Sequence, residues 1–150
     1  GGMPLAVYGG KHEIMECVAP LGSVYQAGTL SGNPCAVAAG IAQLKLIEST
    51  SDLYARIDSS AERLYNAYRE AGLNVNRCGS LLTVFFTDEP VTDYDASVKC
   101  DTAKFAEYWR HMLGCGIYAA PSQFEAMFVS YAHSDEDIER TIQAVGTLKV

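Results

Sequence analysis

The sequence predicts a chain of the α/β to α+β class that is divided near residue 50. Apolar residues recur with the 3.6-residue period of a helix in four stretches, and with the two-residue period of strands between residues 73 and 130. Small polar residues at 48–51 interrupt the helical pattern. The order beyond them, α-β-β-α-β-β-α, is typical of a small domain with helices on one face of a mainly antiparallel sheet.

The first elements predicted are a short strand and a short helix. Leu5 to Tyr8 is an apolar run closed by two glycines, which predicts a buried strand that ends in a turn. Lys11 to Cys17 predicts about two helical turns, and Ala19-Pro20 ends them.

The stretch Tyr25 to Pro34, which reads Y-Q-A-G-T-L-S-G-N-P, concentrates groups that can meet an anion. Gly28 allows a tight turn, and Thr29 offers a hydroxyl. Asn33 is expected to cap a helix that begins at Pro34, so the loop ends at the positive end of a helix dipole. The same pattern also describes an ordinary glycine turn before a helix, and the residues alone leave both interpretations open.

Two helices flank the predicted boundary. Pro34 to Ile47 is rich in alanine and carries apolar residues at helical spacing, which predicts a packed helix. Residues 48–51 end it and supply a new cap, with Asp52 in the first turn of the next helix. That helix has an apolar stripe from Leu53 to Tyr68 and is expected to end at Gly72.

A hairpin and an aromatic helix come next. Apolar and polar residues alternate from Leu73 to Asn76, Cys78-Gly79-Ser80 predicts a turn, and the run Leu81 to Phe86 follows, so two paired strands are predicted. Residues 88–99 have no period and predict a loop. Asp101 is expected to cap a helix that ends at Gly114 or Gly116. The apolar stripe of this helix is predicted to be core and consists of Phe105, Tyr108, Trp109 and Met112.

The last elements predicted are two strands and a helix. Ile117 to Ala120 predicts a third strand, Pro121 to Glu125 a turn, and Met127 to Ser130 a fourth strand. Ser134 and Asp137 have the spacing of a capping box, and a final amphipathic stripe follows them.

Composition narrows the classes of partner. The 150 residues are 49% hydrophobic and carry a net charge of −7 without long charged runs, which argues against a nucleic-acid groove or an anionic membrane surface. No apolar run is long enough to span a membrane. Five widely spaced cysteines fit reduced intracellular thiols, and the three histidines lack the spacing of metal ligands, so no metal site is expected.

Three short sequence motifs, taken together, resemble those of a known family. They are Y-G-G-K-H-E-I-M-E at 8–16, Y-Q-A-G-T-L-S-G-N-P at 25–34 and A-P-S-Q-F-E-A at 120–126. The set is similar to the glutamate-1-semialdehyde aminomutases, which are class III (omega) aminotransferases of pyridoxal-phosphate fold type I. The resemblance covers the whole chain.

The resemblance implies that this is the C-terminal part of a longer enzyme. In the family, the lysine that binds the cofactor lies just before a run of glycines, and this chain opens with Gly1-Gly2-Met3-Pro4. Residues 1–50 are then the end of the large cofactor-binding domain, and residues 51–150 are the small C-terminal α+β domain. None of the lysines in this chain has the context of the catalytic one.

The family's activity is the isomerisation of glutamate 1-semialdehyde to 5-aminolevulinate in tetrapyrrole biosynthesis. The resemblance implies pyridoxal phosphate or pyridoxamine phosphate as cofactor and a small amino-aldehyde as substrate. It also implies a homodimer whose active site is shared across subunits, with neither nucleic acid nor membrane as partner. The expected location is the cytoplasm, or the plastid in a plant.

Four residues receive roles by this resemblance. Gly28 and Thr29 are expected to bind the cofactor phosphate of the neighbouring subunit, and Glu125 is expected to reach the active site as a catalytic group. Tyr25 is expected to line the substrate pocket. The residues alone leave open that Glu125 is a solvated loop carboxylate and that Tyr25 packs into the turn. Met127 stands where a small residue is expected, and it either narrows the pocket or packs.

Two other functions remain open at this stage. One is an omega-aminotransferase of another substrate. The other is a non-catalytic α+β module for binding or dimerisation, because small domains of this element order serve many functions.

Overall fold

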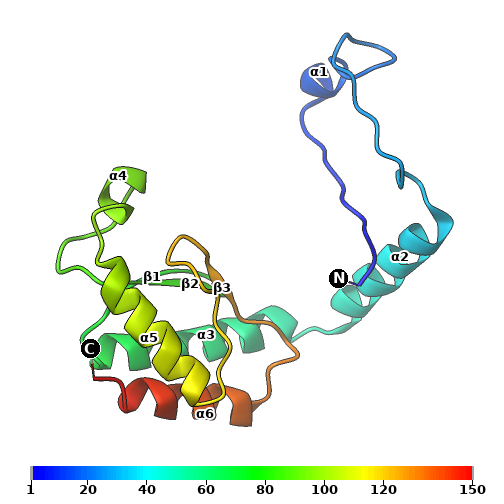
Figure 1. Ribbon diagram of the computed structural model, residues 1–150. Coiled ribbons are helices and arrows are strands. Elements are labelled where there is room, and N and C mark those ends of the chain that lie inside the picture. Colours follow the sequence, from blue (N-terminus) through cyan, green and yellow to red (C-terminus); the bar gives the residue numbers. More distant parts are fainter. Residues whose placement is uncertain (1, 150) are drawn as a thin grey trace. The chain divides into compact units, whose positions relative to one another are not determined.

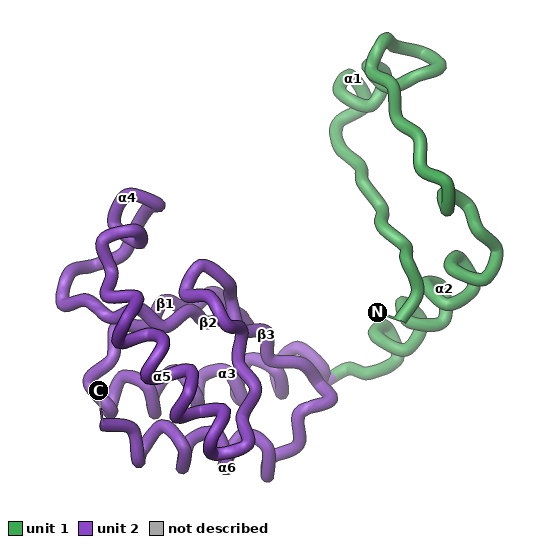
Figure 2. The backbone as a smooth tube through the Cα atoms, in the orientation of Figure 1, with its two compact units in different colours: residues 1–51 green, residues 52–150 purple. Residues whose placement is uncertain are grey.

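The computed structural model describes residues 2–149, and its elements are shown in Figure 1. The chain divides into two compact units, Gly1–Ser51 (unit 1) and Asp52–Val150 (unit 2), drawn in different colours in Figure 2. This division falls one residue after the predicted boundary. Residues 1 and 150, the outer ends of the two predicted domains, lie outside the described residues.

Unit 1 contains the helices α1 (His12–Met15) and α2 (Pro34–Ser49). α1 is shorter than the helix predicted for Lys11 to Cys17. The strand predicted for Leu5 to Tyr8 is wrong, because these residues belong to no sheet and the side chain of Val7 is 88% exposed. A strand needs a neighbour for its backbone groups, and an isolated bridge between Val18 and Val24 is the only strand-type pairing in the described part of unit 1.

α2 begins as predicted. The side chain of Asn33 accepts hydrogen bonds from the amides of Cys35 and Ala36, each at 3.1 Å, and Pro34 occupies the first helical position. A Cβ atom at Gly40 would collide with the side chain of Leu5, so glycine allows the extended N-terminal segment to pack directly on α2.

Unit 2 is built on a three-stranded antiparallel sheet in the order β1-β2-β3, which confirms the predicted hairpin and sheet class. The register pairs Val75 with Val84 and Leu82 with Met127. Its elements are α3 (Leu53–Glu70), β1 (Asn74–Cys78), β2 (Leu81–Phe85), α4 (Tyr94–Ser97), α5 (Thr102–Gly114), β3 (Met127–Phe128) and α6 (Asp135–Gly146).

The core of unit 2 lies between one face of the sheet and the long helices α3, α5 and α6. The strands contribute Val75, Leu82 and Val84, whose side chains share one face because alternate residues of a strand point the same way. This core confirms the predicted stripes of α3, α5 and α6, although Trp109 is only partly buried. Its largest fully buried side chains are Tyr68, Tyr108, Leu82, Met112 and Val145.

Most predicted helix ends in unit 2 are confirmed. Gly72, with φ +81°, follows the end of α3, and Asp101 caps α5 through the amides of Ala103 and Lys104. Both halves of the capping box predicted from Ser134 and Asp137 are present at α6. The prediction that Asp52 lies in the first turn of α3 is wrong. Asp52 occupies the N-cap position, and its side chain makes no capping hydrogen bond.

The strand predicted for Ile117 to Ala120 is wrong, and β3 has two residues rather than four. Backbone groups that a sheet would need are used by α5 instead. The indole N–H of Trp109 donates to the carbonyl of Ala119 at 2.9 Å, and the amide of Ile117 donates to the carbonyl of Met112 at 2.9 Å. These bonds hold the segment beside the helix and away from the ladder.

The loop predicted for residues 88–99 also needs a correction, because it contains the one-turn helix α4. The side chain of Asp93 accepts a hydrogen bond from the amide of Ala96 at 2.8 Å and so caps this turn. A single turn shows no apolar period, so a periodicity argument cannot detect it. Phe85, on the outer face of the sheet, packs with Val91 and Cys100 from the same segment.

Candidate functional site

The loop at residues 28–33 has a shape that depends on its glycines. The amide of Ser31 donates to the carbonyl of Gly28, and the amide of Asn33 donates to that of Leu30, both at 3.0 Å. A Cβ at position 28 would lie 2.8 Å from the Ser31 hydroxyl oxygen, closer than real side chains approach, and Gly32 has φ +71°. A larger residue would therefore strain the backbone at position 32, and at position 28 it would displace the Ser31 hydroxyl.

Hydrogen-bond donors of this loop point to solvent. Thr29 is exposed, and no hydrogen bond among the described residues uses its hydroxyl or the backbone amides of Thr29 and Leu30. A hydroxyl and adjacent free amides are the groups that bind phosphate oxygens at glycine loops before helices. The donor set of the loop therefore fits the phosphate of a cofactor.

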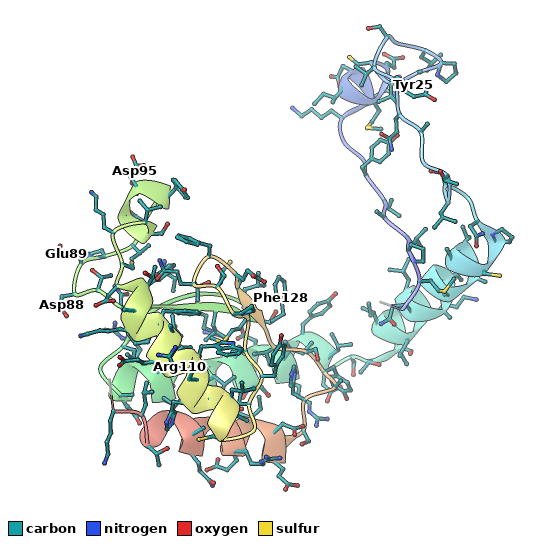
Figure 3. All side chains as sticks on the ribbon, in the orientation of Figure 1. Tyr25, Asp88, Glu89, Asp95, Arg110 and Phe128 are labelled. Carbon is teal, nitrogen blue, oxygen red and sulfur yellow. The ribbon has the colours of Figure 1, made fainter. Side chains whose placement is uncertain are left out.

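A groove of about 790 Å³ runs along this loop within unit 1. Gly28 and its neighbours form one wall, and Pro4 to Tyr8 forms the other. Tyr25 and Thr29 are not among the lining residues. The side chain of Tyr25 is 83% exposed and projects from the segment after α1 (Figure 3), so it does not pack against the described part of unit 1.

Glu125 lies in unit 2, in the loop of residues 120–126 that precedes β3. Its side chain is exposed, and its amide donates to the carbonyl of Ser122 at 3.2 Å. Glu125 also borders a cavity of about 10 Å³ together with Tyr108 and Met127. This volume holds about one water molecule.

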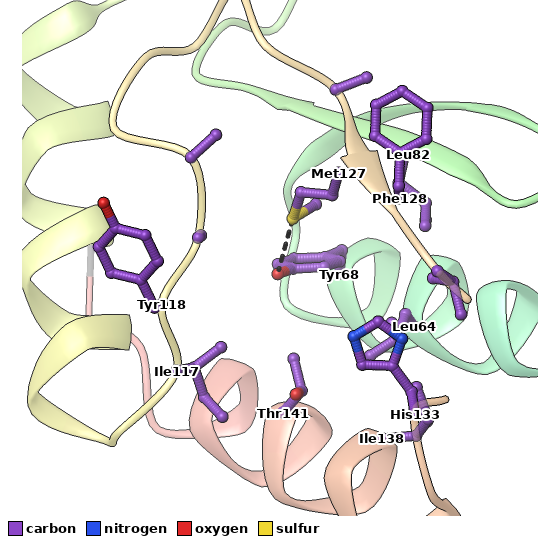
Figure 4. Close-up of a pocket in the computed structure, with 14 residues that line it drawn as sticks. Leu64, Tyr68, Leu82, Ile117, Tyr118, Met127, Phe128, His133, Ile138 and Thr141 are labelled. Atoms are coloured by element: carbon purple, nitrogen blue, oxygen red, sulfur yellow. Dashed lines mark hydrogen bonds between the residues drawn. The ribbon is translucent and has the colours of Figure 1, made fainter. Parts of the chain in front are cut away.

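Met127 packs inward, toward the core. Its sulfur can accept a hydrogen bond from the hydroxyl of Tyr68 at 3.8 Å or from that of Tyr108 at 3.9 Å. Figure 4 shows the first of these bonds at the edge of a cavity of about 260 Å³. The two hydroxyls also lie within hydrogen-bond distance of each other and each has one hydrogen, so the sulfur accepts from whichever hydroxyl does not donate to the other.

The two tyrosines form a buried pair whose hydroxyl oxygens lie 2.8 Å apart, and each side chain is 1% exposed. Burial raises the pKa of Tyr108 and raises that of Tyr68 well above the ordinary value of 10.0. Both hydroxyls are therefore neutral at physiological pH and act as hydrogen-bonding groups.

The 260 Å³ cavity is mainly apolar, and its polar groups have partners. Nδ1 of His133 accepts from the amide of Ser130 at 3.0 Å, and the hydroxyl of Thr141 donates to the carbonyl of Asp137 at 2.8 Å. His133 thus belongs to the turn that leads into α6.

Gln123 is a residue of this region that sequence reasoning missed. Its side chain is 2% exposed, although the residue stands in a loop between the half-buried Ser122 and the exposed Phe124. The side-chain amide donates to the carbonyl of Ser97 in α4 at 3.3 Å. No periodic or compositional signal marks a glutamine in a turn as buried, so only the tertiary structure reveals it.

Two kinds of feature are absent over residues 2–149. The His, Cys, Asp and Glu side chains there form no group of three or more that could hold a metal ion. None of the helices in that range is both long and apolar enough to cross a membrane.

Comparison with protein families and curated sequences gives one consistent result. A family model described as "Aminotransferase class-III" matches residues 1–146. The glutamate-1-semialdehyde 2,1-aminomutase of Acetivibrio thermocellus is 53% identical over 146 residues, which cover 97% of this chain and 34% of that protein. The enzyme of the same name from Chlorobium limicola is 53% identical and is covered to 35%. The chain spans about a third of the length of these relatives.

Solved structures show the same fold. A β-phenylalanine aminotransferase from Variovorax paradoxus matches with a TM-score of 0.75 and 26% identity, covering 93% of this chain and 33% of that one. An omega-transaminase from Sphaerobacter thermophilus matches with a TM-score of 0.66 at 20% identity, covering 91% and 33% respectively. These matches confirm the predicted fold class.

Proposed function

The chain belongs to the class III aminotransferase family, and on that premise we propose that it is the C-terminal part of a glutamate-1-semialdehyde 2,1-aminomutase that uses pyridoxal phosphate. The observation that carries the proposal is the 53% identity to enzymes of this name over nearly the whole chain. The reaction would isomerise glutamate 1-semialdehyde to 5-aminolevulinate. The catalytic lysine would belong to the part of the protein before this chain.

The loop at 28–33 would hold the cofactor phosphate. The Thr29 hydroxyl and the free amides of Thr29 and Leu30 supply the hydrogen-bond donors. Gly28 has no side chain that would block a phosphate from reaching these amides. When bound, pyridoxal phosphate acts as an electron sink for the carbon that loses a proton. The chain's own contribution at this loop is binding and orientation.

The proposed assembly is a homodimer in which this loop contacts the cofactor of the neighbouring subunit. The support is that residues 25–33 contain no lysine or arginine, so the loop lacks a positive side chain of its own. A second anchor from another part of the enzyme would complete the site. We also propose a cytoplasmic location, or a plastid one in a plant, with five free cysteines as support.

Glu125 would orient amino groups of the bound substrate. A carboxylate accepts hydrogen bonds from an ammonium group, and the exposure of this side chain leaves it accessible. An aminomutase must retain its substrate through two amino-group transfers, so a contact of this kind affects retention more than initial binding.

The test is the reaction of the full-length protein with glutamate 1-semialdehyde alone. We expect 5-aminolevulinate to form without an added amino donor or 2-oxo acid, because an aminomutase returns an amino group to the same carbon skeleton. A strict requirement for a second amino donor or acceptor would identify an omega-aminotransferase of another substrate. Failure to bind pyridoxal phosphate would favour the non-catalytic module.

A further inference from the structure

A buried glutamine holds the middle of the loop that carries Glu125. The Gln123 side chain is 2% exposed, and its Nε2 donates to the carbonyl of Ser97 at 3.3 Å. Burying a primary amide is unfavourable unless it is hydrogen-bonded. Because a carbonyl can only accept, the NH₂ group faces Ser97, and this bond is the one that the buried amide makes among the described residues, where its Oε1 has no partner.

Ser97, the partner of Gln123, lies in a segment that is hydrogen-bonded to the hairpin. Ser97 is 8% exposed and ends α4, and the segment around α4 is tied to the outer face of the sheet. The side chain of Asn76 donates to the carbonyl of Val91 at 2.7 Å, and the amide of Asp101 donates to that of Phe86 at 3.0 Å. The two contacts flank α4, so its position follows from that of the hairpin.

Both ends of the loop are held separately. Before the loop, the indole of Trp109 donates to the carbonyl of Ala119. After it, Met127 pairs with Leu82 in the sheet. Between these ends, the Gln123 amide provides the only side-chain hydrogen bond among the described residues that joins the loop to another element.

We propose that Gln123 is a positioning residue for the reaction: its contact with α4 determines where the Glu125 carboxylate lies. The inference rests on the proposed function, because it assigns Gln123 a role that acts through Glu125. Two residues separate them in the sequence, and the Glu125 amide bonds back to Ser122, so a shift of Gln123 moves the whole turn.

The test uses the full-length enzyme with Gln123→Met, which keeps the length and apolar stem of the side chain but removes its donor. We expect kcat to fall at least about tenfold, because small displacements of a catalytic group are costly. KM should stay within about threefold. Amide hydrogen exchange should rise in peptides covering 119–127. Gln143→Met, at an exposed position of α6, is the matched control and should change none of these.

A double-mutant cycle with Glu125→Gln separates positioning from general damage. If Gln123 acts through Glu125, adding Gln123→Met to Glu125→Gln should lower kcat by less than about twofold further. Independent, multiplying losses would overturn the proposal, and so would unchanged exchange in residues 119–127. Amide hydrogen exchange measures how firmly the loop backbone is held, and this readout does not depend on turnover.

The roles of Glu125 and Gln123 can be tested separately. If Glu125→Gln alone leaves turnover unchanged, the proposed role of Glu125 is wrong and the positioning role is overturned with it. If Glu125→Gln impairs turnover while Gln123→Met does not, only the positioning role is wrong. Should Gln123→Met fail to fold, Gln123→Leu also removes the donor without burying a charge, so the same three measurements apply.

Discussion

Thr29 offers a hydroxyl that no group in the described part of unit 1 engages. In the full-length enzyme we expect Thr29→Ala to weaken cofactor binding about tenfold to a hundredfold, since a charge-assisted hydrogen bond contributes about 1.5 to 3 kcal/mol. Thr29→Ser keeps the hydroxyl and should retain most of the affinity. Cofactor retained after dialysis, followed by its absorbance, measures the effect.

A mixing experiment tests whether Thr29 acts across subunits. Dimers formed from the Thr29→Ala chain and a chain without the catalytic lysine should recover part of the activity, because one of the two shared sites then carries neither lesion. Mixed dimers that remain inactive would contradict a loop that acts in trans.

The buried Tyr68–Tyr108 pair predicts a specific response to alkaline pH. Burial raises both pKa values above the ordinary 10.0, so the folded state retains protons that the unfolded state releases. This contribution is fully present below about pH 10 and is lost as the pH rises through the folded pKa values. The melting temperature of wild type should fall more between about pH 9 and pH 11 than that of Tyr68→Phe plus Tyr108→Phe.

The same pair predicts non-additive stability at neutral pH. Tyr68→Phe removes the 2.8 Å partner of the Tyr108 hydroxyl and leaves it only the weak sulfur acceptor of Met127 at 3.9 Å, which costs about 1 to 3 kcal/mol. Replacing both tyrosines removes the unpaired group, so the double variant should lose less than the sum of the two single losses. Additive losses in denaturant unfolding would mean that the hydroxyls do not support each other.

At the scale of elements, helix caps were predictable and sheet partners were not. Asn33, Asp101 and Ser134 all cap the helices that the sequence assigned to them, because capping involves residues within one turn. The segment Ile117 to Ala120 has strand-like composition but bonds to α5, whose position depends on the whole core.

The capping box of α6 predicts an acid-dependent stability. The hydroxyl and amide of Ser134 donate to the Asp137 carboxylate and hold its pKa below the ordinary 3.8. The contribution is therefore present above about pH 4 and is lost as the pH falls through the lowered folded pKa. Asp137→Ala should lower the free energy of unfolding at neutral pH, and this difference should disappear in acid.

Glu136→Ala is the matched control for the capping box. It removes a negative charge from the same first turn of α6, but Glu136 is not part of the capping box. We expect a smaller loss that reflects only the helix dipole. An equal loss in both variants, measured by urea unfolding across pH, would show that charge alone matters and that the cap does not.

At the scale of the molecule, the two units differ in how they bury apolar surface. The residues of the main core cluster all come from unit 2, whereas unit 1 leaves large apolar side chains such as Val7 and Leu44 exposed. We expect residues 52–150 expressed alone to melt cooperatively and residues 1–51 alone not to fold. Circular dichroism and amide NMR dispersion measure both. A molten 52–150 fragment would contradict the independence of this core.

The class of the fold, the long helices and the hairpin could be predicted from the amino-acid sequence alone. These follow from interactions within a few residues: apolar period, caps, and glycines such as Gly72. The motifs at 25–34 and 120–126 that resemble the family are also local, since each lies within ten residues or fewer.

Which backbone groups pair and which polar residues are buried depends on tertiary contacts. Gln123 is buried because α4 lies beside its loop, and Met127 turns inward because two tyrosines from separate helices meet there. Both depend on contacts between residues far apart in the chain. A local pattern cannot encode such contacts, since the free energy of burial depends on what the rest of the fold places around the side chain.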